Sequence, residues 1–139
     1  MKNQEKYNNL SRLVEKLKNS DDPKRKYEYI LWLGKKLKEP GNEILVEKNK
    51  VKGCVSEVFV KANIKSGKLF WEGYSDALIT KGLLAFLITG LNELTPNEVI
   101  KIDKKFIEDT GLRSSLTPSR SNGFLNILLK MQSQANEFL

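Results

Sequence analysis

The fold is decided by residues 57–92, EVFVKANIKSGKLFWEGYSDALITKGLLAFLITGLN, where a strand pattern gives way to a helix pattern. Residues 57–62 alternate between apolar and polar side chains, as a half-buried strand does, and residues 69–73 predict a second short strand. The Lys65-Ser66-Gly67 segment between them predicts a hairpin turn. Residues 77–92 have almost no polar face, which is typical of a central buried helix, and Ser75-Asp76 is its expected cap.

Two further helices are predicted before this stretch. Apolar residues recur at helical spacing over residues 4–18, which indicates an amphipathic helix. Asp22 followed by Pro23 predicts the cap and first turn of a second helix. Residues 44–51 are expected to supply a third strand.

Helices are also predicted after the central stretch. Thr95 and Glu98 have the spacing of a capping box, and Gly111 is expected to end the helical region that follows. Thr117, which precedes a proline, predicts the start of a last helix. The order of helices, small sheet and helices predicts an α+β protein, with one domain over residues 1–139 and an antiparallel sheet of about three strands packed against helices.

Composition narrows the class of protein. The formal net charge is +7, from 24 basic and 17 acidic residues, but the basic residues are mostly scattered lysines. This pattern favours a solvated surface over a nucleic-acid interface, with a docking face for an acidic protein as the second interpretation. The polar start of the chain and the absence of a long apolar stretch lead us to expect a cytoplasmic protein without a membrane span.

Two features of the residue inventory restrict the chemistry. The chain has no histidine, which excludes Cys-His and Ser-His-Asp hydrolases. Its single cysteine, Cys54, cannot form an internal disulfide, a redox pair or a multi-cysteine metal site. Any thiol chemistry must therefore be completed by another molecule.

Cys54 is the first candidate for such chemistry. Lys48, Lys50 and Lys52 precede it closely, and positive charge favours the thiolate, which is the nucleophilic form. Gly53 allows a tight turn and a close approach to the sulfur. From composition alone, a small buried hydrophobic residue is the commoner role of a lone cysteine.

Two charged residues are weaker candidates. Lys81 interrupts an apolar helical stretch, so it should pair, with Asp76 as a candidate partner, or extend to solvent. Arg120 lies in the hydroxyl-rich first turn of the last predicted helix, where an anion or a thiolate would be stabilised. Plain helix capping by Thr117 or Ser119 is the simpler interpretation of that segment.

Three blocks of sequence together resemble the SufE family, the cysteine desulfuration proteins associated with Fe–S metabolism. The blocks are VKGCVSEV at residues 51–58, GYSDALITKGL at 73–83 and LTPSRSNG at 116–123. The chain departs from the family pattern at Val55, where glutamine is common, at Tyr74, where an acidic residue is frequent, and at Thr80, where valine is frequent.

This resemblance implies a compact fold shared with the IscU-type cluster scaffolds, and a role as a sulfur acceptor. Cys54 would take sulfur from a pyridoxal-phosphate cysteine desulfurase of the SufS type, stimulate that enzyme, and pass the sulfur to a downstream Fe–S scaffold complex. The chain itself would bind no cofactor and no metal. The residues expected to support Cys54 or bind the partner are Gly53, Ser56, Asp76, Lys81 and Arg120.

Such a chain is not expected to be a stand-alone enzyme. Because persulfides oxidise and exchange readily, we expect Cys54 to be shielded by an apolar pocket in the free protein, on a loop that swings outward. The alternative is a non-catalytic module that activates a desulfurase or another partner without carrying sulfur. A basic nucleic-acid-binding domain is the third hypothesis, and it predicts salt-dependent affinity.

Overall fold

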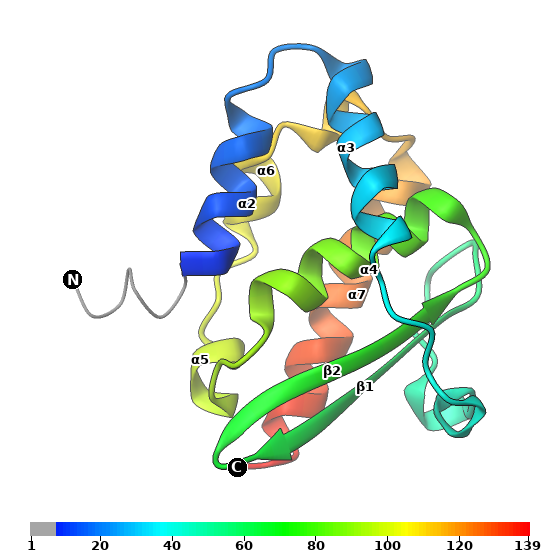
Figure 1. Ribbon diagram of the computed structural model, residues 1–139, viewed down its shortest axis with the longest axis vertical. Coiled ribbons are helices and arrows are strands. Elements are labelled where there is room, and N and C mark those ends of the chain that lie inside the picture. The colour runs from blue at the N-terminus through cyan, green and yellow to red at the C-terminus, as the bar shows by residue number, and fades with distance from the viewer. Residues whose placement is uncertain (1–7) are drawn as a thin grey trace.

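The computed structural model describes residues 8–139 and has an α+β architecture, as expected (Figure 1). The helices are α2 (Asn8–Lys18), α3 (Pro23–Lys35), α4 (Leu78–Leu91), α5 (Pro96–Ile100), α6 (Lys105–Asp109) and α7 (Pro118–Asn136). The strands are β1 (Val58–Lys65) and β2 (Lys68–Ser75). Short 3-10 helices span Asn42–Ile44, Glu47–Asn49 and Leu112–Ser114. The first four residues of the helix expected at 4–18 lie outside the described part of the chain.

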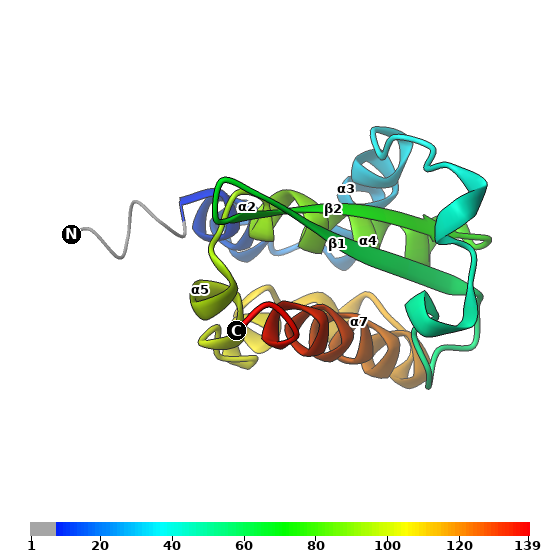
Figure 2. The ribbon, with the colours of Figure 1, turned by 90° about the horizontal axis from the view of Figure 1, so that it is seen from below.

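Helix α4 is the centre of the molecule, as its apolar sequence predicts. It packs against α2, α3, α7 and β2, and Figure 2 shows α7 on the opposite side of the molecule from α2 and α3. Phe86 of α4 and Phe124 of α7 are fully buried and meet edge to face, with ring centroids 5.6 Å apart. Gly82 permits the close crossing with α3, because a Cβ there would lie 2.2 Å from the carbonyl oxygen of Ile30.

The sheet has two antiparallel strands among the described residues, so the expected third strand is wrong. Residues 44–51 instead hold the end of the 3-10 helix Asn42–Ile44 and the whole of Glu47–Asn49, and only Lys50 forms a bridge, with Phe59 of β1. Asn49 is buried and donates a hydrogen bond to the carbonyl of Ile44 at 3.0 Å, which holds the segment in a turn. The predicted hairpin is confirmed, with Ser66 and Gly67 both at positive φ.

The outer edge of β1 is closed by a side chain of α7. Gln134 is buried and accepts a hydrogen bond from the backbone N–H of Ala62 at 2.8 Å. Its amide nitrogen donates to the carbonyl of Val60 at 2.7 Å. Gln134 therefore replaces a neighbouring strand at this edge and ties α7 to the sheet.

Most of the predicted helix ends are confirmed. Asp22 caps α3, Thr95 and Glu98 form a reciprocal capping box on α5, and Thr117 caps α7. Gly111 follows α6 in the left-handed conformation, with φ of 69°. These local signals are carried by side chains and glycines adjacent to the helix, so the sequence alone was sufficient to locate them.

The expected cap of α4 is wrong. Helix α4 begins at Leu78 after Ala77, which has no side-chain cap. The Ser75 hydroxyl accepts the N–H of Ala77 at 3.3 Å, while the Asp76 carboxylate accepts the N–H of Glu57 at 3.0 Å. Asp76 is thus used to hold the segment before β1.

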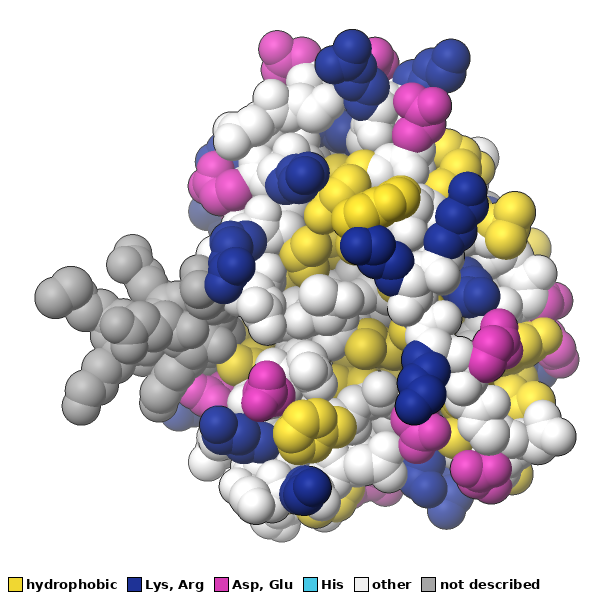
Figure 3. All heavy atoms as spheres, in the orientation of Figure 1, with side chains coloured by type: hydrophobic (Ala, Val, Ile, Leu, Met, Phe, Trp, Pro, Cys, Tyr) yellow, Lys and Arg dark blue, Asp and Glu magenta, His cyan; other side chains and the backbone are white. Residues whose placement is uncertain are grey.

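The surface carries its charge diffusely. Figure 3 shows lysine and arginine side chains spread over the face of Figure 1, interspersed with acidic and apolar groups. Among residues 8–139, no helix is both long and apolar enough to cross a lipid bilayer.

Candidate functional site

Cys54 lies in the loop between the second 3-10 turn and β1, against the N-terminal half of α7. Its side chain is half-buried and packs against the hydrophobic core. The sulfur lies 3.7 Å from the carbonyl oxygen of Gly123. A Cβ at Gly123 would lie 3.4 Å from the sulfur, so a larger residue at this position would crowd the thiol. The free protein therefore shelters Cys54 without sealing it.

The loop is fixed along one face of α7. Asn126 donates a hydrogen bond to the Gly53 carbonyl at 3.0 Å. One helical turn further on, the Lys130 ammonium donates to the carbonyl of Lys48 at 2.8 Å. The spacing of three to four residues places these side chains on a single helix face, which runs antiparallel to the loop.

Gly53 is required by its conformation as well as by its neighbour. Its φ is +81°, in the left-handed region that favours glycine. A Cβ there would lie 2.5 Å from the amide nitrogen of Asn126. The sequence-based reason for this glycine, a tight turn beside Cys54, is confirmed, and the structure adds a close contact with α7.

Arg120 connects three segments of the chain. Its guanidinium donates to the Ser56 hydroxyl at 3.0 Å and to the Thr80 hydroxyl, and these two hydroxyls lie 3.3 Å apart. Thr117 caps the helix by accepting the backbone N–H of Arg120. No residue from 8 to 139 forms an ion pair with Arg120, so the cation is held only by neutral oxygens and can act on an anion at the site.

Burial raises the pKa of the Cys54 thiol above its ordinary value, and the Arg120 guanidinium opposes this shift. The expectation that Lys48, Lys50 and Lys52 supply the activating field is wrong, because Arg120 is the cation that acts on the thiol. Arg120 comes from a segment 66 positions later in the chain, and only the fold places it near the sulfur. The resting thiol is therefore stabilised in its protonated form.

The remaining sequence candidates divide into two groups. Ser56 and Asp76 both hold the Cys54 loop, Ser56 through Arg120 and Asp76 through the backbone of Glu57. Lys81 is not brought to this site, and it does not pair with Asp76. Its ammonium lies 3.4 Å from the Glu39 carboxylate, in the segment after α3.

Three contributors to the site were missed in the sequence: Thr80, Gly123 and Asn126. Gly123 and Asn126 follow Arg120 at intervals of three residues, a helical spacing that could have indicated a shared face. Two exposed apolar side chains adjoin the site, Val55 at 78% exposure and Leu78 at 75%. Among residues 8–139, no cluster of three or more potential metal ligands occurs.

The site places the chain in a class of α+β proteins that present a single cysteine on a loop beside an arginine. The SufE family, described as an Fe-S metabolism associated domain, matches residues 11–135, and the chain belongs to this family. The predicted family resemblance is thereby confirmed.

Individual relatives agree with this assignment. The chain is 50% identical over 130 residues to an uncharacterized SufE-like protein of Synechocystis, covering 94% of this chain and 82% of the relative. It is 39% identical to SufE-like protein 1, chloroplastic/mitochondrial, of Arabidopsis thaliana, covering 91% of this chain and 34% of that protein. It is 32% identical to the cysteine desulfuration protein SufE of Plasmodium falciparum, covering 81% and 47%. The chain thus spans less than half of the length of the last two relatives.

A solved structure supports the fold. The solution structure of a hypothetical protein from Thermus thermophilus superposes with a TM-score of 0.80 at 25% sequence identity. The match covers 93% of this chain and 94% of the other.

Proposed function

We propose that this chain is a sulfur acceptor that takes persulfide sulfur on Cys54 from a cysteine desulfurase of the SufS type. It stimulates that enzyme and delivers the sulfur for iron–sulfur cluster assembly. The observation that carries the proposal is the position of the single thiol, on a loop held by a few polar contacts beside an arginine with no carboxylate partner among residues 8–139. Family membership and relatives named cysteine desulfuration proteins support the same chemistry.

The transfer is a thiol exchange. The Cys54 thiolate attacks the outer sulfur of the desulfurase persulfide, Cys–S–SH, and forms a new S–S bond. The bond between the two desulfurase sulfurs breaks, and its cysteine leaves as a thiolate while the outer sulfur keeps its proton. No oxidant, metal or histidine is needed, because each electron pair stays with a sulfur atom. Cys54 then carries the persulfide to the next acceptor.

Release of the loop makes the thiol reactive. The resting thiol has a raised pKa because it is buried. Movement of the loop toward solvent reduces this burial and therefore lowers the pKa. The loop is held to α7 by hydrogen bonds from Asn126, Lys130 and Arg120. The neutral bond from Asn126 contributes about 0.5–1.5 kcal/mol net and each bond from a charged donor about 1.5–3 kcal/mol, so a docking partner can offset their loss. The exposed Val55 and Leu78 offer that partner apolar contacts beside the loop.

Mass spectrometry of the Cys54 peptide tests this function. After incubation with a SufS-type desulfurase and cysteine, the peptide should gain the mass of one sulfur atom, and reduction should remove it. The Cys54→Ser protein should take up no sulfur and should fail to stimulate the desulfurase. Full stimulation by Cys54→Ser would instead establish the non-catalytic activator as the function.

A further inference from the structure

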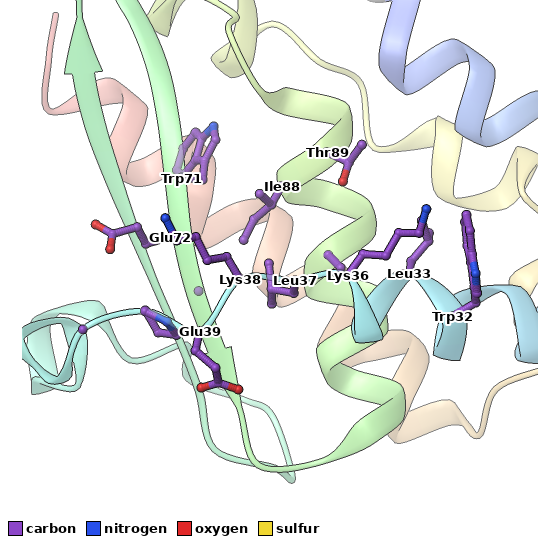
Figure 4. A pocket seen from close by; sticks show the side chains of 14 residues that line it. Trp32, Leu33, Lys36, Leu37, Lys38, Glu39, Trp71, Glu72, Ile88 and Thr89 are labelled. Atoms are coloured by element: carbon purple, nitrogen blue, oxygen red, sulfur yellow. The ribbon is translucent and has the colours of Figure 1, made fainter.

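A groove of about 720 Å³ runs beside the outer edge of β2 (Figure 4). Helix α4 forms its floor through Ala85 and Ile88, and residues 71–73 of β2 form one wall. The C-terminal end of α3 forms the other wall, with Trp32 and Lys36. The groove exists because α3 and β2 both pack on α4 and leave space between them.

The backbone of β2 presents unpaired groups along this edge. In an antiparallel pair, alternate residues direct both N–H and C=O away from the partner strand. Ala62 is opposite Trp71 and donates its N–H to α7, while Leu69 donates its N–H to Leu94. Trp71 and Gly73 likewise direct their N–H and C=O groups away from β1. These groups have no hydrogen-bond partner among residues 8–139.

The unpaired backbone groups of Trp71 and Gly73 border the groove. Trp71 and Gly73 are both buried and both line the groove, so their backbone groups have little access to bulk water. Buried backbone groups are nearly always paired in folded proteins. An extended chain lying in the groove would supply the missing donors and acceptors at the spacing of β2 itself.

The charges around the groove favour an acidic occupant. Of the two carboxylates on its lining, Glu39 forms an ion pair with Lys81 of α4, while Glu72 keeps its charge because its partner is the neutral amide of Asn63. Lys36 lies over the Trp32 ring at 3.8 Å and Lys38 forms no ion pair within residues 8–139. Lys36 and Lys38 therefore outweigh the single charge of Glu72, and the groove favours an incoming carboxylate.

We propose that this groove binds an extended acidic segment of a partner protein, which adds to β2 as a further strand. Its main chain bonds Trp71 and Gly73, and an acidic side chain contacts Lys36 or Lys38. A second copy of β2 does not fit, because its corresponding edge is walled by its own α3. The site is separate from Cys54 and does not depend on sulfur transfer.

The test uses a blocked hexapeptide that alternates valine with glutamate, added to the 139-residue chain under reducing conditions. Backbone amide exchange, followed by NMR, should slow at Trp71 and Gly73 as the peptide saturates. A peptide of the same sequence with every backbone nitrogen methylated should lose binding, because neither edge of its strand can donate. Lys38→Glu should weaken binding roughly fivefold, as expected for one or two exposed ion pairs.

Lys65→Glu is the matched control, since it makes the same charge change at the exposed hairpin turn, away from the groove lining. It should leave peptide affinity within about twofold of the native chain. Equal binding of the methylated peptide, or no change at Trp71 and Gly73 at saturation, would overturn the proposal. So would self-association through this edge, detected as a dimer in sedimentation that the peptide dissociates.

Discussion

The two outer edges of the small sheet differ in their hydrogen bonding. At the β1 edge, Gln134 of α7 bonds both Ala62 and Val60, and Val51 donates its N–H to the Val58 carbonyl at 2.8 Å. At the β2 edge, Trp71 and Gly73 have no such partners among the described residues and face a groove. An unpaired edge is a template for another strand. The β1 edge is thus closed within the chain, while the β2 edge is paired at Leu69 and available at Trp71 and Gly73.

This difference shows how the sheet serves the candidate site. The closed edge is continued by the Cys54 loop, and the helix that closes β1 also holds this loop through Asn126 and Arg120. The position of the thiol therefore depends on the packing of α7 against β1. At the β2 edge, the feature left without a partner within residues 8–139 is the backbone of Trp71 and Gly73.

Removing the closure of the β1 edge should have the largest effect. Gln134→Leu keeps a side chain of similar size but leaves the Ala62 N–H and the Val60 carbonyl buried without partners. Each unpaired buried group costs about 1–3 kcal/mol, so the loss of both partners should lower the free energy of unfolding by about 2–6 kcal/mol. Urea denaturation followed by circular dichroism measures this loss.

Gln132→Leu is the matched control on the same helix. Gln132 also donates to two backbone carbonyls, those of Val99 and Ile102, but it is only partly buried. Water can replace its bonds, so the loss should be clearly smaller than for Gln134→Leu. Equal losses would show that closure of the β1 edge has no special weight.

A smaller loss of stability is expected for a substitution in the Cys54 loop, which α7 also holds. Gly53→Ala places a Cβ at φ of +81° and displaces Asn126, while Gly67→Ala has φ of +77° and no atom within 4 Å. Both changes share the backbone cost of about 1–2 kcal/mol. Only Gly53→Ala should also speed the alkylation of Cys54 by iodoacetamide. If Gly67→Ala speeds alkylation equally, the contact with Asn126 does not restrain the loop.

The smallest effect is expected for removal of the Arg120 charge, and it concerns the pKa of Cys54. Arg120 lowers the pKa of Cys54 against the effect of burial. Arg120→Gln removes the charge but keeps an amide donor for the Ser56 hydroxyl, so it should move that pKa further up. The midpoint of the pH dependence of Cys54 alkylation should shift to higher pH, because less thiolate exists at any given pH. Lys52→Gln removes a charge that is close to Cys54 in sequence, and it should leave the midpoint of the alkylation curve unchanged. A shift caused by Lys52→Gln and not by Arg120→Gln would contradict this assignment.

Several elements of the fold were predictable because their signals are local. The strands around the Lys65-Ser66-Gly67 turn, the apolar α4 and the caps at Thr95 and Thr117 all follow from short-range pattern and capping chemistry. The failures also have local causes. Residues 44–51 contain a buried asparagine that bonds the backbone and favours turns over a strand.

The site was predictable only in part. The lone Cys54, Gly53 and Arg120 could be selected from the sequence, but Lys81 and the three lysines before Cys54 could not be separated from them. A charge acts according to distance in space, and the cation nearest in sequence is not the one that acts on the thiol. Asn126, Thr80 and Gly123 are common residue types whose importance comes from what they touch.

By itself, the sequence determined the α+β class, the family and the restriction to a single thiol, because these depend on residue types and their local spacing. Only the tertiary structure decided that α7 closes β1, that Arg120 acts on Cys54, and that Trp71 and Gly73 of β2 are left unpaired. These outcomes depend on contacts between residues some 60 to 75 positions apart, such as Gln134 with Val60 and Arg120 with Ser56. Packing sets such distances, and no local pattern encodes them.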